Sequence, residues 1–153
     1  MKPGVLIVEL GAGTGAFTGM IVSRMPKNAR LVVLEINPIM AVHLRERIAD
    51  PRVHIIEGDA ADLSLHLEKL SLGKPNYIIS GLPLNNFSHP VRQSILSSIE
   101  EVLDEEGLYI QFQYLLTSLK HIRSMFDAKV LSYEYRNLPP AFVYGCKKRK
   151  AGL

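Results

Sequence analysis

The chain has 153 residues, of which 47 % are hydrophobic and 22 % are charged, and its formal net charge is +3. This length fits one domain, residues 1–153, and this composition excludes a disordered chain. No apolar run approaches the roughly 18 residues of a membrane-spanning helix, no signal peptide is expected, and the single cysteine, Cys146, excludes an internal disulfide. We therefore expect a folded cytoplasmic domain, and the small excess of basic residues mildly favours anionic partners.

Short apolar runs alternate with helical patterns along most of the chain, which predicts a parallel sheet wrapped by helices. In chain order the sequence predicts strand 5–9, helix 16–25, strand 30–35, helix 38–49, strand 53–57, helix 64–70, strand 76–80, a helix that begins at Pro90, strand 108–113 and helix 115–126. Ser64 is expected to cap helix 64–70 at its N-terminus. Gly107, in a left-handed conformation, is expected to end the helix that begins at Pro90. Helix 38–49 is expected to bury Ile39, Val42, Leu44 and Ile48, and the helix after Pro90 to bury Val91, Ile95, Ile99 and Val102.

The last two apolar runs, 129–135 and 142–148, are separated by residues 136–141 alone. This connection is too short for a crossover helix, so the two strands must form an antiparallel hairpin. The sequence thus predicts an α/β fold with a mostly parallel seven-stranded sheet, helices on both faces and a C-terminal antiparallel hairpin.

A glycine-rich turn follows the first predicted strand, with Gly11, Gly13 and Gly15 in five positions and a helix directly after it. Such a turn brings backbone N–H groups together where the carboxylate or phosphate end of a nucleotide-like ligand can bind. The turn also fits the dinucleotide pattern Gly-x-Gly-x-x-Ala, or a purely structural role. Glu9, two residues before the turn, could meet a ligand ammonium group, which favours S-adenosylmethionine over a dinucleotide.

Two acidic residues stand at the ends of the next two predicted strands, where ligands of open α/β sheets bind. Glu35 could accept hydrogen bonds from both ribose hydroxyls, and Asp59 from the exocyclic amine of adenine. The alternatives are a surface glutamate and an Asx turn. Together with the glycine turn, the two acids favour a nucleoside site.

The loop after the fourth predicted strand is the expected substrate loop. Gly81 allows close backbone approach, Pro83 stiffens the loop, and Asn85 and Asn86 offer hydrogen bonds, although the asparagines also suit a simple turn. Tyr114, after the fifth strand, could line an acceptor pocket or only pack. The histidines have no metal-ligand spacing, so no metal site is expected.

Several of these segments together resemble class I S-adenosylmethionine-dependent methyltransferases, and most closely the bacterial phospholipid N-methyltransferases. The matching segments are 8–15, 34–38, 58–63, 80–84 and 136–144. The resemblance implies a Rossmann-like fold, S-adenosyl-L-methionine as cofactor, and an amino phospholipid or membrane surface as partner at the inner membrane face. The cofactor residues it implies are Glu9, Gly11, Ala12, Gly13, Thr14, Gly15, Phe17, Glu35, Ile36, Asp59, Ala60 and Ser80. The substrate-loop candidates are Gly81, Leu82, Pro83, Asn85, Asn86 and Tyr114, and no general base is identified.

The ribosomal RNA adenine dimethylases are the alternative family, because they share the first three motifs. Their fourth motif reads Asn-Leu-Pro-Tyr, in which the polar residue holds the adenine amine and the ring stacks on the flipped base. Here these positions hold Gly81 and Leu84, and Phe87 is the nearest ring that could stack instead. We therefore expect methylation of a lipid amine, with RNA as the alternative substrate.

A third hypothesis is an incomplete cofactor-binding module. The lipid enzymes carry an amphipathic helical segment before the first motif, and such N-terminal cover helices are absent from this sequence. The sequence is also compatible with a homo-oligomer.

Overall fold

The helices and strands follow the alternation expected from the sequence. The computed structural model describes residues 4–114, 116–134, 136 and 141–152. Its strands are β1 (Leu6–Leu10), β2 (Arg30–Glu35), β3 (Val53–Glu57), β4 (Tyr77–Ser80), β5 (Leu108–Gln113), β6 (Phe126–Glu134) and β7 (Ala141–Lys148). Its α-helices are α1 (Ala16–Arg24), α2 (Pro38–Arg47), α3 (Leu63–Lys69), α4 (His89–Val102) and α5 (Leu119–Arg123), and short 3₁₀ helices cover Ala60–Asp62 (η1), Leu84–Asn86 (η2) and Leu116–Ser118 (η3).

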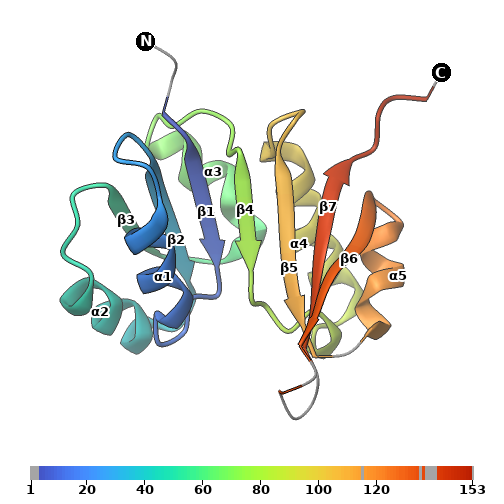
Figure 1. Cartoon of the computed structure of the whole chain (residues 1–153), viewed down its shortest axis with the longest axis horizontal. Coiled ribbons are helices and arrows are strands. Elements are labelled where there is room, and N and C mark those ends of the chain that lie inside the picture. Colours follow the sequence, from blue (N-terminus) through green and yellow to red (C-terminus); the bar gives the residue numbers. More distant parts are fainter. Residues whose placement is uncertain (1–3, 115, 135, 137–140, 153) are drawn as a thin grey trace.

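Within this described part, the strands form a seven-stranded sheet in the order β3-β2-β1-β4-β5-β7-β6 (Figure 1). Strands β1 to β5 are parallel, and β7 lies antiparallel between β5 and β6. The expected mixed sheet with a C-terminal hairpin is confirmed. Because parallel strands end at the same edge, the turns after β1, β2, β3 and β4 meet at one edge of the sheet.

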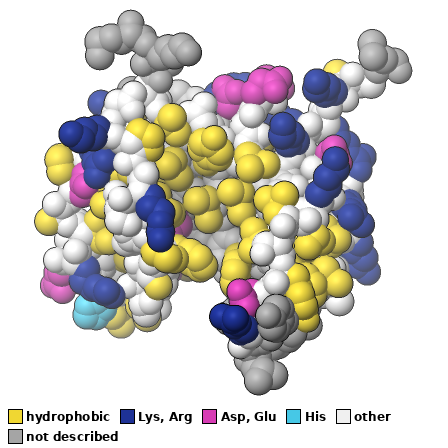
Figure 2. Space-filling model, viewed as in Figure 1, with side chains coloured by type: hydrophobic (Ala, Val, Ile, Leu, Met, Phe, Trp, Pro, Cys, Tyr) yellow, Lys and Arg dark blue, Asp and Glu magenta, His cyan; other side chains and the backbone are white. Residues whose placement is uncertain are grey.

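The two faces of the sheet are covered unequally. On one face α3, α4 and α5 enclose the larger core, which includes the buried residues Leu10, Ile78 and Tyr109. On the other face α1 and α2 cover the β1–β2–β3 half, and hydrophobic side chains gather in the open part beside them (Figure 2). Tyr77 of β4, for example, remains 42 % exposed. Among the described residues, no helix has the length and apolar character needed to cross a bilayer.

The predicted helix 115–126 is wrong at its C-terminal end. Of its described residues, 116–118 form η3, 119–123 form α5, and Phe126 begins β6. Phe126 and Ala128 are buried while Asp127 and Lys129 are exposed, which is the alternation of a strand. The Phe126 ring packs 5.3 Å from that of Tyr109, so burial against β5 outweighs the local helical pattern. Residue 115, and residue 135 of the predicted strand, lie outside the described part.

Two predicted helix boundaries are also wrong. Helix α3 follows directly on η1, so Asp62 takes the cap position, and the Ser64 hydroxyl donates instead to Glu101 Oε1 at 3.1 Å. Helix α4 ends at Val102, and Gly107 is not among the described residues with positive φ. A Cβ on Gly107 would lie 2.9 Å from the Asp104 carbonyl oxygen, so this glycine serves close packing.

Both predicted helix faces need correction. In α2 the buried side is Ala41 and Leu44, because these residues face the sheet beneath the glycine turn, whereas Ile39 and Val42 are 66 % and 49 % exposed. In α4, residues Ile95, Ile99 and Val102 are buried as expected. Val91 is half exposed, because it faces a cavity rather than the core.

We predict that Leu44→Ala lowers the free energy of unfolding by about 2–5 kcal/mol, because it leaves a cavity under the glycine turn. Ile39→Ala on the same helix should change it by less than about 0.5 kcal/mol, as expected for an exposed site. Urea denaturation measures both values. Equal losses for the two variants would contradict the packing described for α2.

Candidate active site

The glycine turn joins β1 to α1 in a left-handed backbone conformation. Gly11 has φ of 73° and Gly13 has φ of 56°, values that residues with a Cβ adopt at a cost. The Gly11 N–H donates to the Leu34 carbonyl of β2 at 2.9 Å, which fixes the start of the turn. A Cβ on Gly13 would meet no atom within 4 Å, so the space above this part of the turn is open.

Glu35, at the end of β2, ties the turn to the next helix. Its side chain is buried; Oε2 accepts a hydrogen bond from the Gly13 N–H at 2.8 Å and Oε1 one from the Asn37 N–H at 2.9 Å. Asn37 in turn caps α2, as its sequence position before Pro38 predicts. Each carboxylate oxygen can accept more than one hydrogen bond, so Glu35 keeps acceptor capacity for a ligand.

Glu9 is a second buried carboxylate below the same turn. It is 3 % exposed, and its Oε2 accepts a hydrogen bond from the hydroxyl of the fully buried Thr18 at 2.7 Å. Burial raises the pKa of Glu9 to about 6; the Thr18 hydrogen bond acts against this shift, and the charge of Glu35 adds to it. Among the described residues, Glu9 and Glu35 take part in no ion pair. The site therefore holds uncompensated negative charge.

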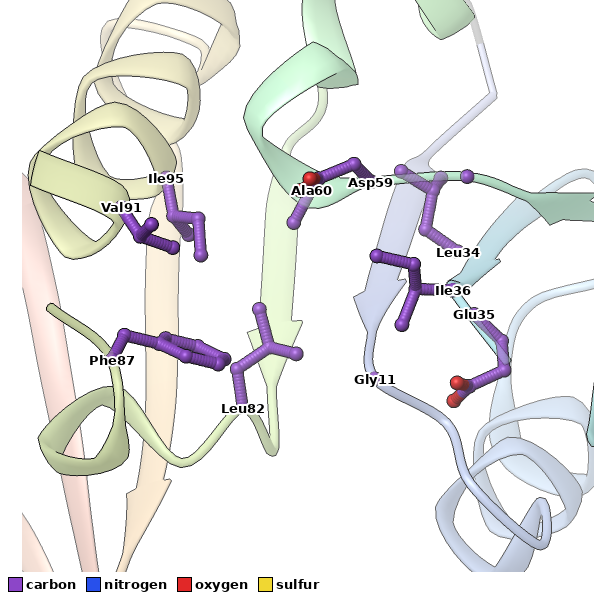
Figure 3. Close-up of a pocket in the computed structure, with 11 residues that line it drawn as sticks. Gly11, Leu34, Glu35, Ile36, Asp59, Ala60, Leu82, Phe87, Val91 and Ile95 are labelled. Carbon is purple, nitrogen blue, oxygen red and sulfur yellow. The ribbon is translucent and has the colours of Figure 1, made fainter.

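A mostly apolar cavity of about 140 Å³ opens beside the turn, and we call it the inner cavity (Figure 3). The expected site residues that line it are Gly11, Glu35, Ile36, Asp59, Ala60 and Leu82. Sequence analysis missed Leu34, Gly58, Val91 and Ile95, and it considered Phe87 only as a stacking ring for a base. Phe87, Val91 and Ile95 come from the start of α4 and the loop before it, and they face Leu34 and Ile36 across the cavity.

Asp59 has two roles at the rim of this cavity. Its Oδ1 accepts a hydrogen bond from the Ala61 N–H at 2.9 Å, which caps η1 in the manner of an Asx turn. The side chain is otherwise exposed, and the residue lines the inner cavity. The structural and the ligand-binding interpretation of Asp59 are therefore compatible.

A second cavity, of about 280 Å³, lies on the other side of Gly11, and we call it the aromatic cavity. It is lined by Gly11, Phe17, Gly81, Pro83, Asn85, Asn86, Phe112, Gln113 and Tyr114. The Phe112 ring stands edge-on to those of Phe17 and Tyr114, with centroids 5.5 Å and 5.9 Å away. Because Gly11 lines both cavities, they meet at the start of the glycine turn.

The loop between the two cavities is held by side chains that sequence analysis did not identify. The Leu82 carbonyl accepts hydrogen bonds from Gln111 Nε2 at 3.0 Å and Gln113 Nε2 at 2.7 Å, both from β5. Arg92 Nη1 donates to the carbonyls of Leu84 and Phe87, each at 3.2 Å. Gln111 and Gln113 stand two positions apart on β5 and so point to the same face of the sheet. This spacing is the sequence signal that could have indicated their hydrogen bonds to the loop.

Some expected cofactor residues line neither cavity. Glu9, Ala12, Gly13, Thr14 and Gly15 instead form or support the glycine turn, and Ser80 shapes the loop after β4. The buried Ser80 hydroxyl oxygen accepts a hydrogen bond from the Leu82 N–H at 3.2 Å. Within the described part of the chain, no group of three His, Cys, Asp or Glu side chains could hold a metal ion.

Comparison with known proteins identifies the family. Residues 7–107 match the family model described as a methyltransferase domain. The chain belongs to the S-adenosylmethionine-dependent methyltransferases. The resemblance noted in the sequence is thus confirmed, and S-adenosyl-L-methionine is the cofactor of this enzyme family.

Individual relatives of this methyltransferase differ in their substrates. It is 34 % identical over 144 residues to the ornithine lipid N-methyltransferase of Singulisphaera acidiphila, covering 93 % of this chain and 75 % of that protein. It is 33 % identical over 104 residues to the ribosomal RNA small subunit methyltransferase A of Leptothrix cholodnii, covering 68 % of this chain and 36 % of that protein. A similar solved structure is that of the N-methyltransferase NodS from Bradyrhizobium japonicum in complex with S-adenosyl-L-homocysteine. Its TM-score is 0.78, and the match covers 95 % of this chain and 79 % of that one. The sequence identity is 11 %, so the likeness is one of fold alone.

We predict that Glu9 makes the stability of the ligand-free methyltransferase fall with rising pH. A pKa raised from 4.5 to about 6 means that the folded state holds the proton more tightly than the unfolded state. The free energy of unfolding should therefore fall by about 2 kcal/mol as pH rises between these two values, and stay level above them. Subtracting the urea-denaturation curve of Glu9→Gln from that of the natural chain isolates this contribution.

Thr18→Val is the companion variant, because it removes the hydrogen bond that lowers the pKa of Glu9. The fall in stability should then extend to higher pH. A difference between the natural chain and Glu9→Gln that does not change with pH would contradict the buried, ionisable Glu9 described above.

Proposed function

We propose that this methyltransferase transfers a methyl group from S-adenosyl-L-methionine to the headgroup amine of an amino lipid. The observation that carries the proposal is the aromatic cavity next to the glycine turn. The rings of Phe17, Phe112 and Tyr114 line this cavity, and the face of an aromatic ring attracts a positively charged, methylated nitrogen through cation–π interaction. An amine that gains methyl groups becomes a better ligand for such a cavity.

The residues of the inner cavity suit the cofactor. Its apolar walls fit the adenine ring, the free acceptor capacity of Glu35 suits the ribose hydroxyls, and Asp59 at the rim suits the adenine amine. The open space above Gly13 leaves room for the carboxylate end. Glu9 is buried under the turn, so we assign it an electrostatic role: its charge favours the cationic sulfonium and ammonium groups without direct contact.

The substrate loop argues against a nucleic-acid base as acceptor. Leu84, at the position of the stacking ring in the RNA adenine dimethylases, is fully buried in the main core. Phe87, the alternative stacking ring, lines the inner cavity on the cofactor side. Neither residue is therefore placed to stack on a base in the aromatic cavity in the way that the fourth motif of the RNA adenine dimethylases does.

The extent of similarity supports the same acceptor class. The match to the ornithine lipid N-methyltransferase covers 93 % of the chain and so includes β5, which with Tyr114 directly after it forms one wall of the aromatic cavity. Methylation of a ribosomal RNA adenine remains the second candidate, favoured by the 33 % identity to the ribosomal RNA small subunit methyltransferase A. That match covers 68 % of the chain.

Methyl transfer depends mainly on the alignment of the reacting atoms. The cofactor supplies an electrophilic methyl group, and the protein holds the acceptor nitrogen in line with it. The nitrogen must be neutral to attack, because an ammonium has no lone pair. Asn85 and Asn86 can accept hydrogen bonds from the amine and orient its lone pair. The two glutamines that bind the Leu82 carbonyl keep the loop in place.

We predict that Asp59→Ala weakens the binding of S-adenosyl-L-homocysteine roughly tenfold, since a hydrogen bond to a charged group contributes about 1.5 kcal/mol or more. Glu35→Ala should weaken it further, because the glycine turn also loses its anchor. Asp62→Ala is the matched control, since Asp62 is exposed in the same segment and makes no side-chain cap hydrogen bond. Calorimetry that found unchanged affinity in both Asp59→Ala and Glu35→Ala would refute the cofactor assignment.

We predict that methyl-labelled S-adenosyl-L-methionine labels amino lipids, tested with phosphatidylethanolamine and ornithine lipid in detergent micelles, and that Asp59→Ala reduces this labelling. Undermethylated ribosomal RNA serves as the competing acceptor in a parallel reaction. Label in the RNA alone would favour the second candidate. Binding of the cofactor with label in neither acceptor would favour a cofactor-binding module.

A further inference from the structure

The two glutamines of β5 differ in how far the protein uses their carboxamide groups. In Gln111, which is fully buried, Oε1 accepts a hydrogen bond from the Tyr109 hydroxyl. Its Nε2 donates to the carbonyls of Leu82 and Phe112, each at 3.0 Å. Both polar atoms of Gln111 therefore have partners. In Gln113 only the nitrogen is used, and it donates to the Leu82 carbonyl at 2.7 Å.

The oxygen of Gln113 is unpaired and accessible. Within the described part of the chain, Gln113 Oε1 accepts no hydrogen bond. The described side-chain atoms that are both enclosed on all sides and unpaired are the hydroxyl oxygens of Ser98 and Ser118. Gln113 Oε1 is not one of them, although the residue as a whole is only 5 % exposed. Because Gln113 lines the aromatic cavity, its oxygen is reached from that cavity.

The orientation of this carboxamide is set by the strand register and by Leu82. Ser80 of β4 lies opposite Gln111 of the parallel strand β5, so Leu82 and Gln113 follow side by side (Figure 1). A carbonyl oxygen can receive only N–H groups, which fixes the Gln113 amide with its nitrogen toward Leu82. The amide oxygen is then fixed as well, on the side away from that carbonyl. Gln113 thus presents one hydrogen-bond acceptor in a defined orientation.

Asn85 and Asn86 line the same cavity but are held less firmly. Neither side chain makes a hydrogen bond to another described residue, and Asn86 is exposed. Their carboxamides must be ordered when an acceptor binds, at a cost in conformational entropy. An oxygen that is oriented before the reaction stabilises developing positive charge without this cost. Gln113 is therefore better placed than either asparagine to hold an amine for transfer.

We propose that Gln113 Oε1 accepts a hydrogen bond from an N–H of the acceptor amine, and so assists methyl transfer to amines that still carry an N–H. The inference rests on the proposed function, in which the aromatic cavity holds the acceptor nitrogen. During transfer the nitrogen lone pair forms the new N–C bond, the electron pair of the broken S–C bond stays on sulfur, and the product ammonium releases a proton to water. Because the nitrogen becomes positive, its hydrogen bond to Gln113 Oε1 is stronger in the transition state than before it.

The number of N–H groups falls with each methyl group that is added. A neutral primary amine has two, a secondary amine has one and a tertiary amine has none. Gln113 can therefore assist the first and second transfers but not the third. A role limited to holding the loop would affect all three transfers alike, so the two roles of Gln113 are separable.

The test compares three acceptors in detergent micelles: phosphatidylethanolamine, its N-methyl derivative and its N,N-dimethyl derivative. Gln113→Met should lower kcat about tenfold with the first two, as expected for loss of a hydrogen bond to a charged group. It should lower kcat much less with the dimethyl lipid. KM should change less than kcat, because the hydrogen bond strengthens only as the nitrogen becomes charged.

Arg92→Met is the matched control. It removes the hydrogen bonds from Arg92 Nη1 to the carbonyls of Leu84 and Phe87 and so loosens the same loop, but Arg92 lines neither cavity. It should change the three transfers in equal proportion. If Gln113→Met also changes all three in equal proportion, the proposal is overturned and Gln113 is only an anchor of the loop.

A binding measurement tests the oxygen without any transfer. Trimethylammonium has one N–H and tetramethylammonium has none, while their charge is the same and their shapes are similar. In NMR spectra of the isotope-labelled natural chain, trimethylammonium should shift the side-chain amide signal of Gln113 more than tetramethylammonium does. Equal shifts from the two ions, including no shift from either, would overturn the proposal.

The role of Gln113 and the lipid acceptor can fail separately. Transfer to the lipids with the same pattern in Gln113→Met and Arg92→Met refutes the role of the oxygen and leaves the proposed function supported. A larger shift with trimethylammonium, without transfer to any of the three lipids, refutes the lipid acceptor and supports the oxygen as a ligand for another amine. If the natural chain methylates the first two lipids but not the dimethyl lipid, the comparison of the two ions decides.

Discussion

The buried negative charge below the glycine turn is the constraint on which the site depends. A carboxylate without a counter-ion is costly to bury, so each must receive hydrogen bonds. Glu35 receives them from Gly13 and Asn37, and Glu9 receives one from Thr18. These bonds fix the turn against β2 and α1, and they hold the left-handed backbone in which Gly11 separates the inner from the aromatic cavity. The unneutralised charge below the turn matches a family whose cofactor carries a sulfonium and an ammonium group.

The meeting of the glycine turn, Glu35 and Asp59 at one edge of the sheet could be predicted from sequence because its signals are local. A glycine turn, Glu35 and Asp59 each follow directly on a short apolar run, and parallel strands bring such ends to one edge. Val91 could not be predicted in the same way. It belongs to the same apolar stripe of α4 as Ile95 and Ile99, and a helical period cannot tell a residue that faces a cavity from one that faces the core.

The errors in the elements have related causes. Residue 126 continues a helical pattern in the sequence, yet a buried position beside Tyr109 makes it the start of β6. Ile39 and Val42 fit an apolar helix face, but Leu44 is the residue that packs beneath Gly15, where a Cβ would come within 2.6 Å of it. In each case a contact with a distant part of the chain determines the element or the buried face. The local sequence pattern does not contain that contact, so it cannot predict the result.

The loop after β4 lies between two parts of the site that differ in how far the family match covers them. The match to the methyltransferase family ends at residue 107, directly before β5, and so contains the turn, Glu35 and Asp59 but not Phe112 or Tyr114. The glutamines of β5 reach back to the Leu82 carbonyl and set the loop between the two parts. In the proposed function the aromatic cavity holds the acceptor, so changes in β5 would alter acceptor choice while the residues around the glycine turn stay the same. We propose that this separation lets one architecture serve relatives named for a lipid and for ribosomal RNA.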